Sequence, residues 1–271
     1  MQRILRALAI AGIAVLFAAM PAGAITGNFV EDFEHEYVGL VVFYDESGEP
    51  SHRCSGSLIS PTLFLTAGHC TVGVTDAQIW FEQEVTTASG YPLTGGYTGT
   101  AYTYGEPFAS FPDIQDVGLV VLDKPVPKRV VDEYASLAGA GFLDEAALNE
   151  PKKGITFTVS GYGLQDVKPV VVAVRERLMA TSQLVNLANS LTDGFNLQTT
   201  ASPGEGRGGT CSGDSGGPIL YGTTDIIVAV NSFGLNANCA GLDFSYRIDR
   251  QEVLDWILSF DAKGEVQVVA F

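Results

Sequence analysis

The chain is divided into short runs of apolar or alternating residues, each bounded by turn-forming residues. The runs are rich in Val, Ile, Phe and Tyr, and Gly, Pro, Asp and Ser separate them, a pattern typical of β-strands joined by turns. The runs are 38–44, 63–67, 117–122, 155–159, 170–174, 218–221 and 226–230. With 46% hydrophobic residues, the 271-residue chain has ample material for packed cores. The sequence therefore predicts an all-β globular protein.

One segment near the C-terminus departs from the strand pattern. Asp249 and Glu252 stand three residues apart, as in a capping box at the start of a helix. The apolar residues that follow fall on one face of a helix: Val253, Ile257 and Phe260. We expect a C-terminal helix, followed by a tail, residues 261–271, to which the sequence assigns no role.

The region 125–151 shows no clear strand pattern and contains the run Gly139-Ala140-Gly141. We place the link between two β units there, which predicts a first unit at residues 25–135 and a second at residues 136–271. No internal repeat or low-complexity tract points to another organisation.

The first residues have the order of a secretory signal peptide. Arg3 and Arg6 precede an apolar run at 7–20, and small residues occupy positions 22–24. The apolar run is too short for a comfortable bilayer span, which disfavours the alternative of an uncleaved membrane anchor. We expect residues 1–24 to be removed as a signal peptide and the protein to be secreted, periplasmic or extracellular.

The mature chain expected from this cleavage is strongly acidic. Residues 1–24 hold two of the 15 basic residues and none of the 31 acidic ones, so the rest carries a formal charge of −18. Such a surface repels nucleic acid and anionic lipid. We expect no nucleic-acid partner and no membrane partner after signal cleavage, and solubility is the simplest explanation of the acidity.

Four cysteines, an even number, remain in a chain expected to leave the reducing cytosol: Cys54, Cys70, Cys211 and Cys239. Two disulfides follow, with three connectivities open at this point. No pair has C-x-x-C spacing, so we expect no metal site of that kind. No calcium motif is convincing, because Glu82 and Glu84 could equally be solvated charges, and no cofactor is expected.

The segment 211–218 places one serine, Ser215, among glycines at positions 213, 216 and 217. Glycines let backbone amides approach a substrate atom closely and accept dihedral angles that other residues resist. A serine becomes a useful nucleophile only when a base takes its proton and a third group orients that base. A Gly-rich hairpin turn is the alternative explanation of this segment.

Only three histidines could serve as the base: His35, His52 and His69. His69 ends an apolar run and stands beside Cys70, which could fix it. The G-x-S-x-G elbow of the α/β-hydrolases requires a histidine after the serine, yet every histidine precedes Ser215. The subtilisin order needs an acid before His69, and neither Asp32 nor Asp45 has Gly-rich surroundings.

Together these segments resemble the chymotrypsin and trypsin family of serine proteases. Residues 65–70 resemble that family's histidine motif, and residues 213–218 match its serine motif at every position. Residues 116–122, an acid that opens an apolar strand, resemble its aspartate motif. The resemblance spans residues 25–260.

The resemblance implies an all-β fold of two packed antiparallel six-stranded β-barrels with a C-terminal α-helix, and an active site in the cleft between the barrels. The first barrel would bring His69 and Asp116 to this cleft, and the second would bring Ser215. Asp113 competes with Asp116, but only Asp116 leads directly into the apolar strand. The backbone amides of Gly213 and Ser215 would form the oxyanion hole.

The resemblance also implies two disulfides, Cys54–Cys70 beside the histidine and Cys211–Cys239 beside the specificity pocket. Ile25 resembles the family's mature N-terminus, whose ammonium group pairs with the acid that precedes the nucleophile, here Asp214. The predicted signal cut falls just before Ile25. We therefore expect export itself to liberate the activating terminus, with no separate propeptide.

The substrate pocket implied by the resemblance consists of Gly209, Thr210, Ser232, Phe233, Gly234 and Asp243. Gly209 stands at the base, where trypsin-like enzymes hold an acid, and Gly234 would leave the mouth of the pocket open. Asp243 either occupies the opposite wall, where it could attract Lys or Arg, or is a solvated loop residue. A basic, a broad and an apolar preference all stay open.

We therefore expect a secreted serine endopeptidase that cleaves protein or peptide substrates through an acyl-enzyme intermediate, with protein inhibitors as further candidate partners. Two alternatives use the same fold. One is a catalytically silent binding protein, which the presence of all three triad residues disfavours. The other is a secreted serine esterase, which only a comparison of substrates separates from a peptidase.

Overall fold

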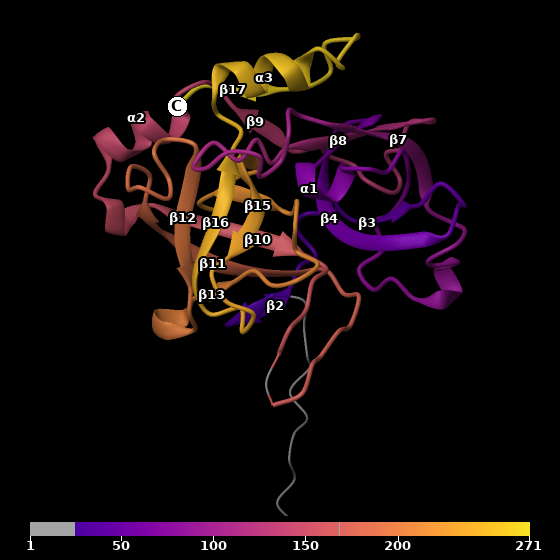
Figure 1. Cartoon of the computed structure of the whole chain (residues 1–271), viewed down its shortest axis with the longest axis horizontal. Helices are drawn as coiled ribbons and strands as arrows, with labels where there is room; N and C mark the ends of the chain where they lie inside the picture. Colours follow the sequence, from indigo (N-terminus) through magenta and orange to yellow (C-terminus); the bar gives the residue numbers. More distant parts are fainter. Residues whose placement is uncertain (1–24, 168) are drawn as a thin grey trace, which may run out of the picture.

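The computed structural model describes residues 25–167 and 169–271, which form two β-barrels side by side (Figure 1). The first barrel is a closed sheet of six strands in the order β3-β4-β5-β8-β7-β6, and every pairing is antiparallel. Its strands are β3 (Val38–Tyr44), β4 (Pro50–Ser60), β5 (Leu63–Thr66), β6 (Asp76–Trp80), β7 (Tyr97–Thr103) and β8 (Gly118–Leu122).

The second barrel follows the order β14-β10-β11-β12-β16-β15 and closes through the pairing of β15 with β14. Its strands are β10 (Thr156–Gly161), β11 (Leu178–Asn186), β12 (Asn196–Ala201), β14 (Pro218–Tyr221), β15 (Ile226–Gly234) and β16 (Gly241–Arg247). All six pairings are antiparallel. The predicted fold of two six-stranded antiparallel barrels is confirmed.

Short elements extend the barrels. The short strands are β1 (Thr26–Gly27), β2 (Phe29–Glu31), β9 (Ser136–Ala138), β13 (Gly208–Gly209) and β17 (Val268–Val269). The α-helices are α1 (Gly68–Thr71), α2 (Phe142–Asn149) and α3 (Gln251–Leu258), and the 3₁₀ turns are η1 (Thr87–Ser89), η2 (Lys152–Gly154) and η3 (Gly204–Gly206). The tail forms β17, which pairs with β9, so the C-terminus is tied to the second barrel.

The hydrophobic core crosses from one barrel to the other. All seven residues of β3 are buried, because one face lines the first barrel and the other faces its neighbours. The same cluster of buried side chains includes Tyr162 and Tyr246 from the second barrel. Each large apolar side chain that is fully buried contributes roughly 1.5–3 kcal/mol to folding. The shared core therefore holds the edges of the two barrels, where the candidate site lies, against each other.

One of the expected strands is absent from the described structure. Residues 170–174 form no strand: Val170 and Val171 are more than half exposed, and only an isolated bridge joins Asp166 to Val172. The apolar composition of this run suits a strand, but within the described residues it pairs with no strand. The region 125–151, which showed no clear pattern, contains the short strand β9 and the helix α2.

The predicted C-terminal helix is confirmed as α3, but its predicted capping box is wrong. Arg250 occupies the N-cap position, and no side chain caps the helix. Asp249 instead binds the buried Arg247 guanidinium and accepts a hydrogen bond from the Leu143 amide in the first turn of α2. A buried cation needs a carboxylate partner, and this requirement outweighs capping. α3 also packs on the first barrel, where Trp256 contacts Tyr104.

No helix among the described residues is long and apolar enough to cross a membrane. The predicted signal peptide, residues 1–24, lies outside the described residues. The predicted boundary between residues 135 and 136 stays a prediction; the strands of the first barrel end at Leu122, and those of the second begin at Thr156.

Candidate active site

β5 leads almost directly into the one-turn helix α1, which carries His69. Gly68 permits this close turn, because a Cβ atom there would lie only 2.7 Å from the Pro107 side chain and 2.9 Å from the Val117 amide nitrogen. The His69 side chain remains 30% exposed. One edge of the imidazole is thus packed and the other is accessible from solvent.

Asp116 lies two residues before β8 and is fully buried. Its carboxylate accepts hydrogen bonds from the His69 amide at 2.7 Å, from His69 Nδ1 at 2.9 Å and from the Ser232 hydroxyl. These donors from both barrels fix the carboxylate and the ring that faces it. The competing Asp113 points elsewhere, because its carboxylate accepts a hydrogen bond from the Tyr246 hydroxyl at 2.6 Å.

Ser215 lies in the turn between β13 and β14 and is partly exposed. The turn needs glycine at two positions, because Gly213 and Gly216 have φ angles of 98° and 80°. The carbonyl of Ser215 accepts a hydrogen bond from the Ser55 amide of β4 at 2.9 Å. This bond ties the serine turn of the second barrel to the first barrel, next to the Cys54–Cys70 disulfide.

The amides of this turn face in two directions. Gly216 and Gly217 donate to the carbonyls of Asn231 and Asp214, whereas the N–H groups of Gly213 and Ser215 find no acceptor in the described part of the chain. The described hydrogen bonds join His69 to Asp116 but do not include one from the Ser215 hydroxyl to His69. Catalytic hydrogen bonds are often long in a ligand-free enzyme and tighten with substrate.

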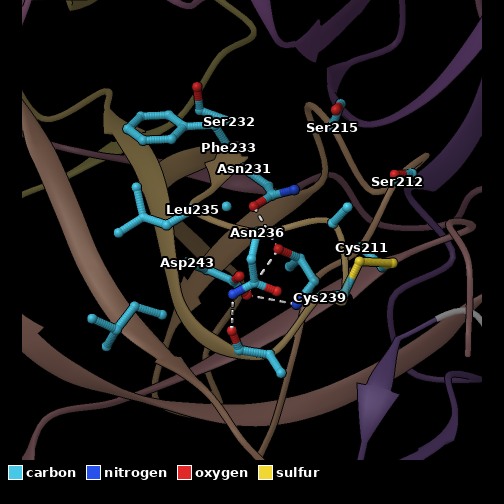
Figure 2. Close-up of a pocket in the computed structure, with 15 residues that line it drawn as sticks. Cys211, Ser212, Ser215, Asn231, Ser232, Phe233, Leu235, Asn236, Cys239 and Asp243 are labelled. Carbon is cyan, nitrogen blue, oxygen red and sulfur yellow. Dashed lines mark hydrogen bonds between the residues drawn. A yellow bond between two sulfur atoms is a disulfide. The ribbon is translucent and has the colours of Figure 1, made fainter. Parts of the chain in front are cut away.

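Both implied disulfides are confirmed. Cys54 pairs with Cys70, and Cys211 pairs with Cys239. The first disulfide links β4 to the helix that carries His69, and Cys70 Sγ lies 4.0 Å from the carbonyl oxygen of Ser215. The second joins the start of the serine turn to the loop that precedes β16 and lies beside the cavity described next (Figure 2).

A cavity of about 380 Å³ opens beside Ser215 (Figure 2). It contains five of the six residues expected in the substrate pocket: Thr210, Ser232, Phe233, Gly234 and Asp243. Gly209 lies behind the cavity wall, where a Cβ atom would come within 2.5 Å of Ala201 and 2.8 Å of Asp243 Oδ2. Any larger side chain at position 209 would therefore displace the acid.

Asp243 is not a solvated loop residue, because it lies on β16 and is only 4% exposed. Its Oδ2 atom accepts hydrogen bonds from the Thr210 amide at 2.6 Å and the Thr210 hydroxyl at 2.9 Å. Burial raises the pKa of this carboxyl to about 6, and the two bonds from Thr210 oppose the rise. Asp243 thus gives the cavity a carboxyl group that ionises near neutral pH.

Sequence reasoning missed an aromatic cluster at the mouth of the cavity. Phe233 stacks on Phe244 with ring centroids 4.8 Å apart, and Phe108 and Phe111 meet the Phe233 ring edge-on. The Phe108 ring also lies 6.0 Å from the ring of His69. The signal in the sequence was two phenylalanines in a proline-containing loop just before Asp116, which the strand pattern does not explain.

The two residues of the expected activation pair are both fully buried. Ile25 packs in the core of the second barrel and leads into β1, which pairs with β13. The Asp214 carboxylate accepts hydrogen bonds from the amides of Gly163 and Cys211. No ion pair to Asp214 occurs among the described residues. Burial therefore raises the pKa of Asp214 well above its usual value.

Comparison with known proteins gives consistent results. The sequence model of the Trypsin family matches residues 29–257. A brachyurin of Leptuca pugilator is 30% identical over 217 residues, which cover 75% of this chain and 85% of the relative. Trypsin theta of Drosophila erecta is 27% identical over 191 residues, 68% of this chain and 67% of the relative.

Among solved structures, one titled HL collagenase aligns with a TM-score of 0.62 and 19% identity. The alignment covers 83% of this chain and 93% of the collagenase chain, and it bears on the fold alone. The family match over most of the sequence and the relative at 30% identity are the stronger findings. From them we conclude that this chain belongs to the trypsin-like serine protease family.

Proposed function

We propose that this protein is a secreted serine endopeptidase that cleaves peptide bonds with His69, Asp116 and Ser215 as its catalytic triad. Membership of the family supports a peptidase activity. The observation that carries the triad is the bond from His69 Nδ1 to the buried Asp116 carboxylate, at 2.9 Å. A carboxylate only accepts hydrogen bonds, so Nδ1 carries the proton and Nε2 is left with its lone pair.

In the proposed mechanism, the Ser215 hydroxyl attacks the scissile carbonyl carbon while His69 Nε2 accepts its proton. The imidazolium that forms is stabilised by Asp116, and it then protonates the leaving amine, which yields an acyl-enzyme. Water, deprotonated by His69, releases the acid product and restores Ser215. The free N–H groups of Gly213 and Ser215 support their role as the oxyanion hole.

We propose that the cavity beside Ser215 takes a lysine or arginine side chain. The cavity wall carries Asp243, whose Oδ2 atom binds Thr210 while Oδ1 makes no hydrogen bond among the described residues. Ionised, Asp243 would pair with a cation in a largely desolvated site. Gly234 has no side chain and so leaves room for the alkyl part of the substrate, and the aromatic ring of Phe233 gives that alkyl part an apolar surface to pack on.

We further propose that signal cleavage before Ile25 creates the activating N-terminus. Asp214 is a buried carboxylate without a cation among the described residues, and such a group strongly favours acquiring one. An ammonium group on Ile25 would supply it and order the neighbouring amides of the serine turn. N-terminal sequencing of the secreted protein should begin at Ile25; any other start would refute this part of the proposal.

Peptide hydrolysis by the secreted protein, with Ser215→Ala as the control, tests the proposed activity. We expect cleavage of internal peptide bonds in a peptide library, and its loss in the folded variant. Cleavage of esters with intact peptides would favour the esterase alternative. Turnover of neither would favour a binding protein. Protein inhibitors that fill the cavity are a further expected class of partner.

A further inference from the structure

A second and larger cavity, of about 960 Å³, is lined in part by β2 and β11, which pair with each other. β2 lies at the opposite end of the second barrel from α3 (Figure 1). It shares no lining residue with the cavity beside Ser215. Its walls combine residues of β1, β2, β10 and β11 with residues of the segments between strands, among them Glu34, His35 and Asp166. Neither the triad nor the proposed substrate pocket explains this cavity.

His35 lines this cavity and is held by a buried carboxylate. Asp32 is fully buried, and its two oxygens lie 2.9 and 3.0 Å from His35 Nδ1. The same carboxylate accepts hydrogen bonds from the His35 amide at 3.0 Å and from the Ser160 hydroxyl of β10 at 2.5 Å. The His35 side chain is only 6% exposed. The ring is thus fixed by contacts that do not involve the cavity.

The fixed ring presents one acceptor to the cavity. Burial raises the pKa of Asp32, but the hydrogen bonds that its carboxylate accepts from His35 and Ser160 help to hold this pKa below its usual value. The ionised Asp32 carboxylate only accepts hydrogen bonds, so His35 Nδ1 carries a proton and donates it. When the ring holds that one proton, Nε2 is an acceptor. Nε2 has no hydrogen-bond partner among the described residues, and the atom is not fully buried, so a ligand can reach it.

The other polar groups of the cavity also accept hydrogen bonds. Asn28 uses its amide nitrogen on the carbonyls of Pro203 and Arg207, which leaves its oxygen free. Thr158 donates its hydroxyl proton to the Gly222 carbonyl. Two carboxylates, Glu34 and Asp166, and the hydroxyl-bearing Thr181 and Thr223 also line the cavity. No lysine or arginine stands among the described residues that line the cavity, so its field favours a cation.

The remaining wall is apolar. Phe29, Val30 and Met179 line it, and Val30 is 57% exposed although it is a large hydrophobic residue. A ligand with an alkyl stem and a head that only donates hydrogen bonds would match both walls, as ammonium and guanidinium side chains do. A metal ion is a poorer match, because no group of three metal-binding side chains converges here among the described residues.

We propose that this cavity is a second binding site, which takes an alkylammonium or alkylguanidinium group such as a lysine or arginine side chain of a polypeptide. The head would donate to His35 Nε2 and lie near Glu34 and Asp166, and the stem would pack on Phe29 and Met179. Asp32 and Ser160 position His35 and do not contact the ligand.

The test is an NMR titration of the ¹⁵N-labelled secreted protein carrying Ser215→Ala, which prevents self-digestion. The probe is n-butylammonium at pH 8, and n-butanol, a neutral molecule of the same length, is the control. We expect saturable shifts at His35 Nε2 and the Thr158 and Thr181 amides with butylammonium only. Binding in the first cavity would be recorded separately, at Leu235 and Asn236. Equal shifts with butanol, or none near His35, would overturn the proposal.

Two variants locate the interaction. His35→Phe should weaken binding at this cavity at least about tenfold, as expected for a lost hydrogen bond to a charged group. If that variant does not fold, the double variant Glu34→Gln, Asp166→Asn at the surface takes its place in the test. We expect it to weaken the binding of butylammonium about fivefold. Glu36→Gln removes one negative charge beside His35 but outside the cavity, and it should bind as the parent does. A double variant that binds like Glu36→Gln would also overturn the proposal.

Discussion

Replacing Asp243 by asparagine should separate substrates with lysine or arginine at the cleavage site from substrates with leucine there. Asparagine keeps the shape of the side chain, and its oxygen can still accept both hydrogen bonds from Thr210. The variant therefore removes the charge from the cavity wall and little else. Deleting one partner of a buried, hydrogen-bonded charge pair costs about 2–5 kcal/mol.

The structure narrows this range. One carboxylate oxygen of Asp243 is occupied by Thr210, so the substrate cation gains one acceptor oxygen rather than two. We take about 3 kcal/mol, which corresponds to a loss of about 150-fold in kcat/KM at about 1.36 kcal/mol per factor of ten. The value for a matched leucine substrate should change less than about threefold, since an apolar side chain makes no ion pair.

The assay measures kcat/KM for two peptides that differ only in lysine or leucine at the cleavage site, with Asp76→Asn on the exposed start of β6 as a charge-matched control. In the parent enzyme, the lysine-to-leucine ratio should rise from pH 5 to pH 7.5, because the pKa of Asp243 is raised to about 6 and the carboxyl is charged only above that pH. The ratio in Asp243→Asn should be flat. An equal loss on both peptides, or no loss, would refute the assignment of Asp243 to the pocket.

Other perturbations follow from the same geometry. Ser232→Ala removes one donor to the buried Asp116 carboxylate, so kcat should fall about tenfold at nearly constant KM in steady-state assays. Replacing both Cys211 and Cys239 by alanine opens a loop of 28 residues, so the free energy of unfolding in denaturant titrations should fall by about 3–4 kcal/mol. Burial and then Glu31 raise the pKa of Glu176 to about 7 in the folded protein. The folded state therefore favours the protonated carboxyl, and the free energy of unfolding falls as the pH rises from about 4.5 through 7. Glu176→Gln should therefore raise Tm at pH 8.5 and leave it unchanged at pH 4.

The parts of the fold that the sequence predicted correctly depend on local patterns. Strands such as β3 and β8 can be recognised in the sequence because each is a short, continuous run of mostly apolar residues, nearly all of which are buried in the barrel. The disulfide pairing came from the family resemblance, since four cysteines alone allow three connectivities. The motifs around His69 and Ser215 were visible for a similar reason, because each is a continuous segment whose glycines are required by close packing.

Features that arise between distant segments could not be predicted in this way. Whether Asp243 faces the cavity depends on the register of β16 against its two neighbours, which one sequence does not contain. Asp249 looked like a helix cap because of its position just before the apolar helical pattern. Its actual partner, Arg247, needs a carboxylate because it is buried in the folded barrel, and the sequence does not show this burial. His35 was not chosen as the catalytic base, and its role was not predicted. Its ring contacts the Asp32 carboxylate, which also accepts a hydrogen bond from Ser160, 128 residues away from Asp32 in the sequence.

The central claim is that His69 and Asp116 make the hydroxyl of Ser215 reactive in the folded protein. Its most direct measurement is labelling by an alkyl fluorophosphonate, followed by intact mass and peptide mapping. We predict one adduct per molecule, on Ser215, with the rate reduced at least about a thousandfold in a folded His69→Ala variant. A folded, correctly processed protein that takes no label, or takes it at the same rate without His69, would contradict the account.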